Sequence, residues 1–438
     1  MSEDPKDTIA PGTFLPSRRQ RFAPLARRIF LRLVKAKKVE GAGTLVLTED
    51  WGQGPTRTIG TGDLRAQMTV HDRDAYAAIV FGGSRGMGRS YVNGLWDTED
   101  MSAVVRYLFR VSQPGRSRQD QRARRRRALG GVAPRWARAV VGARLSRDRD
   151  KLGDRKNIHA HYDLSNELFE LMLDETLAYS CAIFQDEATT LREAQSEKFD
   201  RICRKLGLGA NDHVLEIGTG WGGFALHAAK HYGAKVTTTT ISQNQRHAAE
   251  QRVKEAGLGH LVTVIGEHYR DLKGSFDALV SIEMIEAVNW RNYEEFFEKC
   301  SSLLTEKGRM ALQAITIADQ SFERAKVRKD FIRDLIFPGG CLPSVTAIMS
   351  AVTGATDLRL VDLEDIGLHY ARTLRLWARN VDEKFDQIRA LGFDDRFKRL
   401  WDMYLRYCEG AFLERHISDV QLLLHKPGAP VTPGYRVS

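Results

Sequence analysis

The sequence predicts an α/β protein with a mostly parallel, doubly wound sheet, preceded by a smaller α+β domain. Strand-like apolar runs alternate with helix-like runs from Asn157 onward, which is typical of parallel sheets covered on both faces. A glycine-rich loop follows the first of these strands. The part before them contains short β-rich segments without this alternation. With 438 residues, the chain has room for both parts.

Composition narrows the class of protein. The chain is 42% hydrophobic and 28% charged, as expected for a globular protein. It contains no apolar run of about 18 residues and no leader-like segment at its start, so we expect a cytoplasmic protein. Five scattered cysteines form no C-x-x-C pair and predict no metal site. The net charge of +10 favours an anionic partner, either nucleic acid or a membrane surface.

Four segments follow from the changes in composition. We expect a disordered N-terminus over residues 1–16, an accessory domain over 17–112, a basic linker over 113–156 and the α/β domain over 157–438. The linker contains Arg124 to Arg127 and one short predicted helix over 136–145. It is either a solvated spacer or a docking segment for anionic lipid. Aromatic residues for base stacking are scarce there, so nucleic acid is disfavoured and a membrane surface is preferred.

The accessory domain begins with a basic amphipathic helix over 18–38, broken near its start by Pro24. This helix either packs on its own domain or contacts a membrane. The β-rich segments that follow are 44–48, 66–70 and 75–81. The glycine-rich segment 83–88 is predicted to be a turn, and 90–96 completes the domain.

The α/β domain is predicted element by element. We expect helices over 193–206, 223–232, 243–256 and 292–304, and strands over 213–217, 235–240, 262–265, 276–282 and 308–314.

The most informative stretch is HVLEIGTGWGGF, from His213 to Phe224. Glycines suit a loop that approaches a ligand closely at the carboxyl end of a strand. The spacing of Gly218, Gly220 and Gly223 also fits a nicotinamide-binding loop, so glycines alone do not choose the cofactor. The second strand ends at Thr240 without the acid that a nicotinamide ribose would need. Together with Glu216, this favours the E-x-G-x-G loop of S-adenosylmethionine methyltransferases.

At this point the sequence resembles the cyclopropane-fatty-acyl-phospholipid synthase family, which includes mycolic acid cyclopropane synthases. The resemblance is densest from Asn157 to Lys426 and rests on several long motifs. These are NIHAHYDLSNELFELMLDETLAYSCAIF, VLEIGTGWGGFA, TISQNQ, EMIEAV, FPGGCLPS and HYARTLRLW, with SYVNGLW in the accessory domain. It implies a Rossmann-like class I methyltransferase fold that uses S-adenosylmethionine and acts on an unsaturated phospholipid in the bilayer. It also implies a peripheral position at the inner face of the membrane and self-association as a homo-oligomer.

The resemblance also assigns site residues. The residues implied to contact S-adenosylmethionine are Tyr179, Ser180, Gly218, Gly220, Trp221, Thr240, Gln245 and Tyr269. A bound bicarbonate ion is implied to act as the base, with Cys181, Glu286, Gln313 and Tyr370 around it and the backbone near Ile315 in reach. Gln313 departs from the pattern, since many relatives carry His there, and an amide cannot change its charge near pH 7.

Physical chemistry gives each of these residues a second interpretation. Glu286 follows the fourth strand, at the ligand-binding edge of the sheet, but a carboxylate is also favoured at the start of a helix. Cys181 and Tyr370 would otherwise be ordinary core residues. No histidine is placed to activate Cys181, so a covalent cysteine mechanism is disfavoured.

Three functions remain open on the sequence. The first is cyclopropane formation on the cis double bond of phospholipid acyl chains, through a carbocation that bicarbonate deprotonates. The second is methylation of the same bond, giving a methylene- or methyl-branched chain. The third is a non-catalytic lipid- or nucleic-acid-binding protein that has kept the fold.

Overall fold

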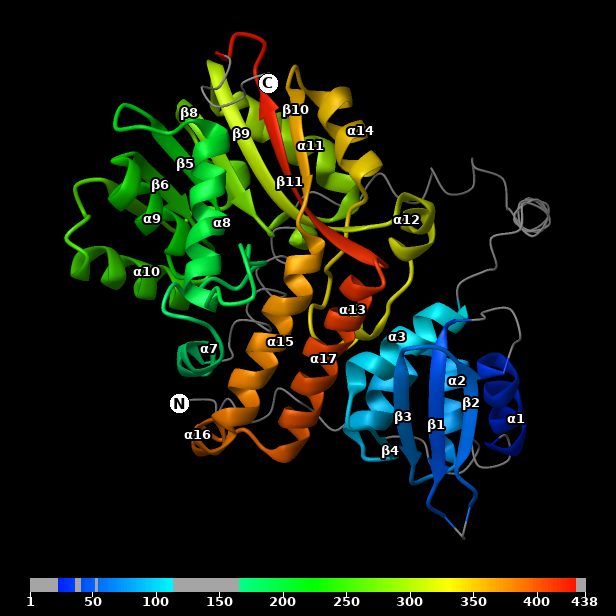
Figure 1. Ribbon diagram of the computed structural model, residues 1–438. Coiled ribbons are helices and arrows are strands. Elements are labelled where there is room, and N and C mark those ends of the chain that lie inside the picture. The colour runs from blue at the N-terminus through cyan, green and yellow to red at the C-terminus, as the bar shows by residue number, and fades with distance from the viewer. Residues whose placement is uncertain (1–22, 36–40, 52–53, 113–164, 431–438) are drawn as a thin grey trace, which may run out of the picture. The chain divides into compact units, whose positions relative to one another are not determined.

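The computed structural model describes residues 23–35, 41–51, 54–112 and 165–430. The predicted disordered N-terminus over 1–16, the basic linker over 113–156 and its helix over 136–145 lie outside these residues. The chain divides into two compact units, Met1–Ala160 and His161–Ser438, each described below by itself. Both are drawn in Figure 1.

The first unit is an α+β domain built on a four-stranded sheet in the order β2-β1-β3-β4. Strand β1 runs antiparallel to β2 and parallel to β3, and its residues alternate between buried and partly buried. This alternation places one face of the sheet against a core. The elements are α1 (Ala23–Val34), β1 (Gly43–Glu49), β2 (Arg57–Thr61), β3 (Arg65–Val70), α2 (Asp74–Val92), β4 (Trp96–Asp97) and α3 (Met101–Ser112).

Helix α1 confirms the predicted amphipathic helix and packs its apolar face within its own unit. Phe30 and Val34 are buried, whereas Leu25 and Leu33 are exposed. Arg27 donates two hydrogen bonds to the buried Glu49, with N–O distances of 2.6 and 2.7 Å. Pro24 stands in the first turn of α1, where a missing N–H costs nothing, and the part of the predicted helix before Ala23 lies outside the described residues.

Two predictions in this unit are wrong. Residues 75–81 are helical in α2 and do not form a strand, because a short apolar run alone does not separate strand from helix. The segment 83–88 is also part of α2, in which Gly83 alone leaves the helical region, with φ 57° and ψ −142°. The helix therefore bends at Gly83 where a turn was expected. Strand β2 was not predicted.

The second unit contains the predicted mostly parallel sheet, with strands in the order β10-β11-β9-β8-β5-β6-β7. Strands β5 to β9 are parallel, and β11 runs antiparallel to both of its neighbours. The predicted strands 213–217, 262–265 and 276–282 and the helix 223–232 have the bounds that the structure shows. The strands are β5 (His213–Ile217), β6 (Lys235–Thr239), β7 (Val262–Ile265), β8 (Phe276–Ile282), β9 (Leu304–Ile317), β10 (Arg359–Asp365) and β11 (Ile417–His425).

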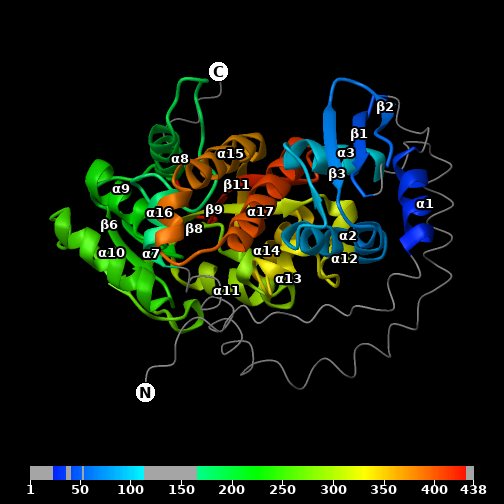
Figure 2. The same ribbon diagram turned by 90° about the horizontal axis from the view of Figure 1, so that it is seen from below.

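Helices cover both faces of this sheet, as a doubly wound fold requires. One core lies between the sheet and α8, α9 and α10, and a second lies between the sheet and α11 and α14. Figure 2 shows α8 and α11 on opposite sides of the strands. The helices are α7 (Asn166–Met172), α8 (Leu191–Leu206), α9 (Gly223–Tyr232), α10 (Gln243–Glu255), α11 (Tyr293–Ser302), α12 (Asp319–Ala325), α13 (Phe331–Leu335), α14 (Val345–Ala355), α15 (Gly367–Glu383), α16 (Phe385–Ala390) and α17 (Asp395–Leu413), with short 3₁₀ turns η3 (Tyr269–Asp271), η4 (Ile285–Ala287) and η5 (Trp290–Asn292).

The helices α15 and α17 lie side by side next to the carboxyl end of the sheet (Figure 1). Strand β10 leads into α15, and α17 leads back into β11, whose first residue Ile417 pairs with Ile317 at the end of β9. Side chains of this helical pair can therefore reach the edge where parallel strands bind ligands. Among the described residues, none of the helices is both long and apolar enough to cross a bilayer.

Candidate active site

The glycine loop after β5 has the backbone conformation that its sequence predicts. Gly218 and Gly220 have φ angles of 107° and 51°, in the region that favours glycine. The amides of Gly218 and Thr219 both donate to the carbonyl of Thr239, at 3.0 and 3.1 Å, which ties the loop to β6. A Cβ added at Gly220 would meet no atom within 4 Å. The loop therefore leaves room for a ligand beside its backbone.

The other residues predicted to contact the cofactor lie around this loop on three separate segments. The Thr240 hydroxyl donates to Gln245 Oε1 at 2.9 Å, at the start of α10. Trp221 donates to Asn166 Oδ1 at 3.0 Å, so the loop is joined to α7. Tyr269 lies in η3 and packs edge-on against Phe296.

Glu216, the acid of the E-x-G-x-G pattern, is buried behind the loop. Its Oε2 lies 2.6 Å from the Thr238 hydroxyl, which is also 2.7 Å from the Thr219 hydroxyl. Burial raises the pKa of Glu216 from 4.5 to about 8. The side chain is therefore a neutral acid at pH 7, held between the first two strands.

This carboxyl makes the protein's stability depend on pH. Between pH 4.5 and about 8 the native state binds more protons at Glu216 than the unfolded state does, so stability falls as pH rises through that window. In the Glu216→Gln variant, the free energy of unfolding is expected to fall by several kcal/mol less across this window than in wild type. Urea unfolding at each pH, with the exposed Glu255→Gln as control, measures it. Equal slopes for wild type and Glu216→Gln would contradict the expectation. Glu286 contributes a slope of the same sign, so the variant remains somewhat pH-dependent.

An aromatic wall joins the cofactor loop to the carboxyl edge of the sheet. The Tyr179 ring lies 5.2 Å from both Phe169 and Trp377, measured between ring centroids, and its hydroxyl is 2.8 Å from that of Tyr404. Tyr370 continues the wall, 6.0 Å from Trp377. These rings come from α7, α15, α17 and the segment before α8, and Phe169 also contacts Trp221 of the glycine loop, with 4.8 Å between ring centroids.

Buried polar groups hold the segment that carries Tyr179 and Ser180. Gln195 donates to the Ser180 carbonyl at 2.9 Å, and Lys198 Nζ donates to the Ser180 hydroxyl at 2.6 Å. Both side chains come from α8 and are fully buried. Burial lowers the pKa of Lys198 to about 8, so this lysine still carries a positive charge at pH 7.

Three of the four residues predicted to bind bicarbonate meet at one carboxylate, that of Glu283. Its Oε1 accepts hydrogen bonds from the Cys181 amide and from Gln313 Nε2, both at 2.8 Å. Its Oε2 accepts from the Tyr370 hydroxyl at 2.6 Å. Glu283 stands directly after β8, so the cluster lies at the carboxyl edge of the sheet.

Two further buried polar side chains, Asp419 and Gln421, contact this cluster through Gln313. Asp419 accepts from Gln313 Nε2 at 2.9 Å, and Gln421 donates to Gln313 Oε1 at 3.1 Å. Burial and the neighbouring Glu283 raise the pKa of Asp419 well above its usual value. Burial also raises the pKa of Glu283, and the positive charge of Lys198 is among the influences that oppose this rise.

The fourth predicted residue, Glu286, lies close by but makes different contacts. Its Oε1 accepts from the Ile315 amide, and its Oε2 is buried without a hydrogen-bond partner among the described residues. Burial, followed by the charge of Glu283, raises the pKa of Glu286 to about 8. The two carboxyl groups thus share one electrostatic environment.

The Cys181 thiol takes no part in the cluster as a nucleophile. The side chain is fully buried, and its sulfur donates to the Ala182 and Ile366 carbonyls. Burial raises the pKa of the thiol well above 9.0, which is the opposite of what a nucleophilic cysteine needs. The contact of Cys181 with Glu283 is made by its backbone amide.

The bicarbonate ion implied by the resemblance does not fit this arrangement. The donors that would hold it, namely Cys181, Gln313 and Tyr370, already donate to Glu283. The Ile315 amide already donates to Glu286. No step is therefore routed through bicarbonate.

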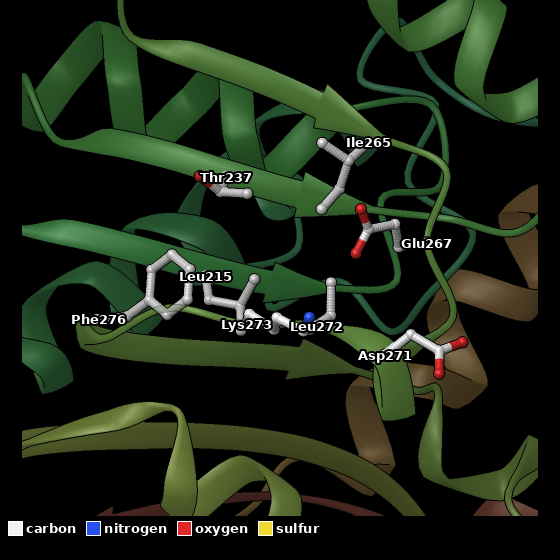
Figure 3. A pocket seen from close by; sticks show the side chains of 8 residues that line it. All are labelled: Leu215, Thr237, Ile265, Glu267, Asp271, Leu272, Lys273 and Phe276. Carbon is white, nitrogen blue, oxygen red and sulfur yellow. The ribbon is translucent and has the colours of Figure 1, made fainter.

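A cavity of about 450 Å³ lies on one side of the cofactor half of the sheet. Figure 3 shows it running from Glu267 and Asp271, at the carboxyl end, back along the strands to Leu215 and Phe276. None of the predicted site residues lines it. We therefore build the site on the cluster and the glycine loop, not on this cavity.

Comparison with known proteins identifies the family. The family described as mycolic acid cyclopropane synthetase matches residues 149–422. The chain belongs to this family.

Relatives within the mycolic acid cyclopropane synthetase family match along most of the chain. A Mycobacterium tuberculosis protein named tuberculostearic acid methyltransferase UfaA1 is 37% identical over 385 residues, covering 85% of this chain and 86% of that protein. The Escherichia coli (strain K12) cyclopropane-fatty-acyl-phospholipid synthase is 34% identical over 366 residues, covering 82% and 87%. A solved structure of mycolic acid cyclopropane synthase CmaA1 complexed with SAH and CTAB has a TM-score of 0.58 at 31% identity, covering 62% of this chain and 98% of that one.

As a member of this family, the chain is an S-adenosylmethionine-dependent methyltransferase with a class I fold. Its residues fit this cosubstrate: the loop offers backbone at Gly218, open space beside Gly220 and an aromatic wall at Tyr179. When bound, S-adenosylmethionine supplies a methyl group that reacts as an electrophile.

Sequence reasoning missed the residue at the centre of the cluster. Glu283 is the first residue of the EMIEAV motif, yet the prediction chose only Glu286. The available signal was a carboxylate directly after a buried strand of a parallel sheet. Asp419 and Lys198 gave no comparable signal, because each lies far from the motif in sequence and is brought to it only by the fold.

Proposed function

We propose that this methyltransferase transfers the methyl carbon of S-adenosylmethionine to the cis double bond of an unsaturated acyl chain in a membrane phospholipid. One observation carries the proposal: a buried carboxylate cluster and an aromatic wall adjoin the glycine loop at one edge of the sheet. The printed names of the relatives support it, since one acts on fatty-acyl phospholipid and another was solved with SAH, the product that S-adenosylmethionine leaves.

The aromatic wall suits the charge that this reaction creates. An alkene that attacks an electrophilic methyl becomes a carbocation, which water would capture. Tyr179, Trp377 and Tyr370 exclude water, and their ring faces attract positive charge. A carbocation then needs a group that removes a proton, and the carboxylate cluster supplies one.

Two products satisfy this chemistry, and the proposal keeps the cyclopropane as the first. Ring closure and formation of a methylene branch can both end with proton loss from the transferred carbon; the branch requires a hydride shift first. The second candidate is a methylene-branched chain, and a methyl-branched chain would need a further reduction by a separate two-electron donor. A relative that is named a methyltransferase and matches 85% of this chain is consistent with this candidate.

Labelled S-adenosylmethionine and phospholipid vesicles test the proposal. We expect label in the acyl chains of dioleoyl phosphatidylglycerol and none in those of the saturated dipalmitoyl lipid. Proton NMR of the isolated methyl esters then distinguishes cyclopropane ring protons from vinylic protons. Absence of label in the unsaturated lipid, from protein that binds S-adenosylmethionine, would overturn the proposal.

Association with an anionic membrane surface through the basic residues and formation of a homo-oligomer are further parts of the proposal. They rest on the net charge of +10 and on the resemblance, respectively. Binding to vesicles of increasing anionic-lipid content, repeated at rising salt, tests the first because screening weakens electrostatic docking.

A further inference from the structure

We propose that Glu283 is the catalytic base of this enzyme and takes the place that bicarbonate has in the resembled family. The inference rests on the proposed function, because it concerns the proton lost after one-carbon transfer to an alkene. It assigns that step to a side chain of the protein itself, so that no added anion is needed.

The hydrogen-bond pattern carries the inference. A carboxylate has the same planar pair of oxygens as bicarbonate, and three of the donors expected around the ion are found around Glu283. The Cys181 amide and Gln313 Nε2 donate to one oxygen, and the Tyr370 hydroxyl donates to the other. The amide of Gln313, where many relatives carry His, is neutral and donates to both Glu283 and Asp419. A glutamine therefore suits a site whose anion is built in.

The backbone at Glu283 is held in an unusual conformation. Its φ of 49° lies in the left-handed region, which is unfavourable for a residue with a Cβ. The Glu283 amide donates to the Gln313 carbonyl at 2.8 Å, which fixes this conformation. Strain of this kind persists where a site needs it, and here it aims the carboxylate at its three donors.

The position next to the cofactor loop is suitable for a base. Met284, the next residue, approaches Gly218 so closely that a Cβ there would lie 3.4 Å from the Met284 Cβ. Glu283 therefore adjoins the glycine loop, while its donors Cys181 and Tyr370 adjoin the aromatic wall. Glu283 is therefore at the edge of the site where the transferred carbon would lose its proton.

The electrostatics favour proton uptake. Burial raises the pKa of Glu283, whereas the Tyr370 hydrogen bond and the charge of Lys198 oppose the rise. Asp419 and Glu286, the other carboxyl groups nearby, also have raised pKa values. Glu283 accepts three hydrogen bonds, whereas Glu286 accepts one from a backbone amide and its Oε2 accepts none among the described residues, so the hydrogen-bond donors favour the anionic form at Glu283.

The proton-transfer step balances within the site. Glu283 enters as a carboxylate beside the carbocation, and one C–H bond of the transferred carbon breaks. The proton goes to a Glu283 oxygen, and the electron pair forms either the third bond of a cyclopropane ring or, after a hydride shift, a C=C bond. The product is neutral, and the resulting Glu283 acid returns its proton to water before the next turnover.

Two variants, each with and without bicarbonate, test the inference. In buffer freed of carbon dioxide, wild type should keep its full turnover, and Glu283→Gln should lose about 10²-fold or more with unchanged S-adenosylmethionine affinity. Glycine at position 283 tolerates the positive φ. The Glu283→Gly variant should be equally slow without bicarbonate, but it should recover turnover in millimolar bicarbonate, because the donors that Glu283 leaves free can bind the ion. Glu175→Gln, at an exposed carboxylate, is the control.

Binding gives a readout that does not depend on activity. Carbon-13 NMR of labelled bicarbonate should show binding to Glu283→Gly and not to wild type, and denaturant unfolding should show both variants folded. Bicarbonate-dependent turnover or bicarbonate binding by wild type, or near wild-type turnover by Glu283→Gln, would overturn the inference. If the proposed function is wrong, wild type itself will label no lipid. The bicarbonate-binding comparison will then still decide whether Glu283 fills the anion site.

Discussion

Replacing Tyr370 by phenylalanine is expected to lower kcat about 10- to 100-fold without changing the affinity for S-adenosylmethionine. The variant loses the 2.6 Å hydrogen bond to Glu283 Oε2, and a hydrogen bond to a charged group contributes about 1.5–3 kcal/mol. Loss of this donor also raises the pKa of Glu283, since the Tyr370 hydrogen bond lowers it. Because the base must be deprotonated, the acidic limb of the kcat profile should move to higher pH. Turnover of vesicles across a pH series measures both effects.

A matched control separates this effect from the general cost of removing a buried hydroxyl. Tyr293 is also buried, and its hydroxyl donates to the Cys341 carbonyl at 3.0 Å, away from Glu283. Tyr293→Phe should therefore lower stability slightly and leave the pH profile in place. Equal changes in kcat and pH profile for the two variants would show that Tyr370 acts only in packing.

The α/β half of the fold could be predicted because its signals are local. Strand β5 is a buried apolar run that ends at glycines, and helix α8 begins with a capping box formed by Thr190 and Glu193. The accessory domain was harder to predict. Residues 75–81 combine three alanines with aromatic and β-branched residues, and a run this short does not separate strand from helix by its periodicity, although the structure makes it helical.

The site residues also divide into those that a local sequence signal predicts and those that only the fold brings together. The glycine loop and the residues of the motifs could be placed at the carboxyl edge because each follows a recognisable strand. What the sequence does not give is the pairing of side chains across the fold: Gln313 on β9 meets Asp419 on β11, 106 residues away. The sequence named Glu286 and not Glu283 for this reason, since only the structure shows which carboxylate receives the donors.

Replacing Gly86 by alanine is expected to unfold the accessory unit while the methyltransferase unit continues to bind S-adenosylmethionine. The bend of α2 at Gly83 brings the Gly86 backbone against that of Ala78, and an added Cβ would lie 1.8 Å from the Ala78 carbonyl oxygen. Backbone atoms on both sides cannot yield easily, so we expect a loss of more than about 4 kcal/mol. Calorimetry should show one transition lost or lowered, and titration calorimetry should show unchanged cofactor affinity.

Gly82→Ala is the matched control, because a Cβ at Gly82 would meet nothing within 4 Å and alanine is the better helix former. This variant should be as stable as wild type or slightly more so. If the accessory unit is needed for lipid handling, Gly86→Ala should also lose phospholipid labelling while Gly82→Ala keeps it. Undiminished labelling by a Gly86→Ala protein whose first unit is unfolded would remove that role and leave the methyltransferase unit to recruit lipid alone.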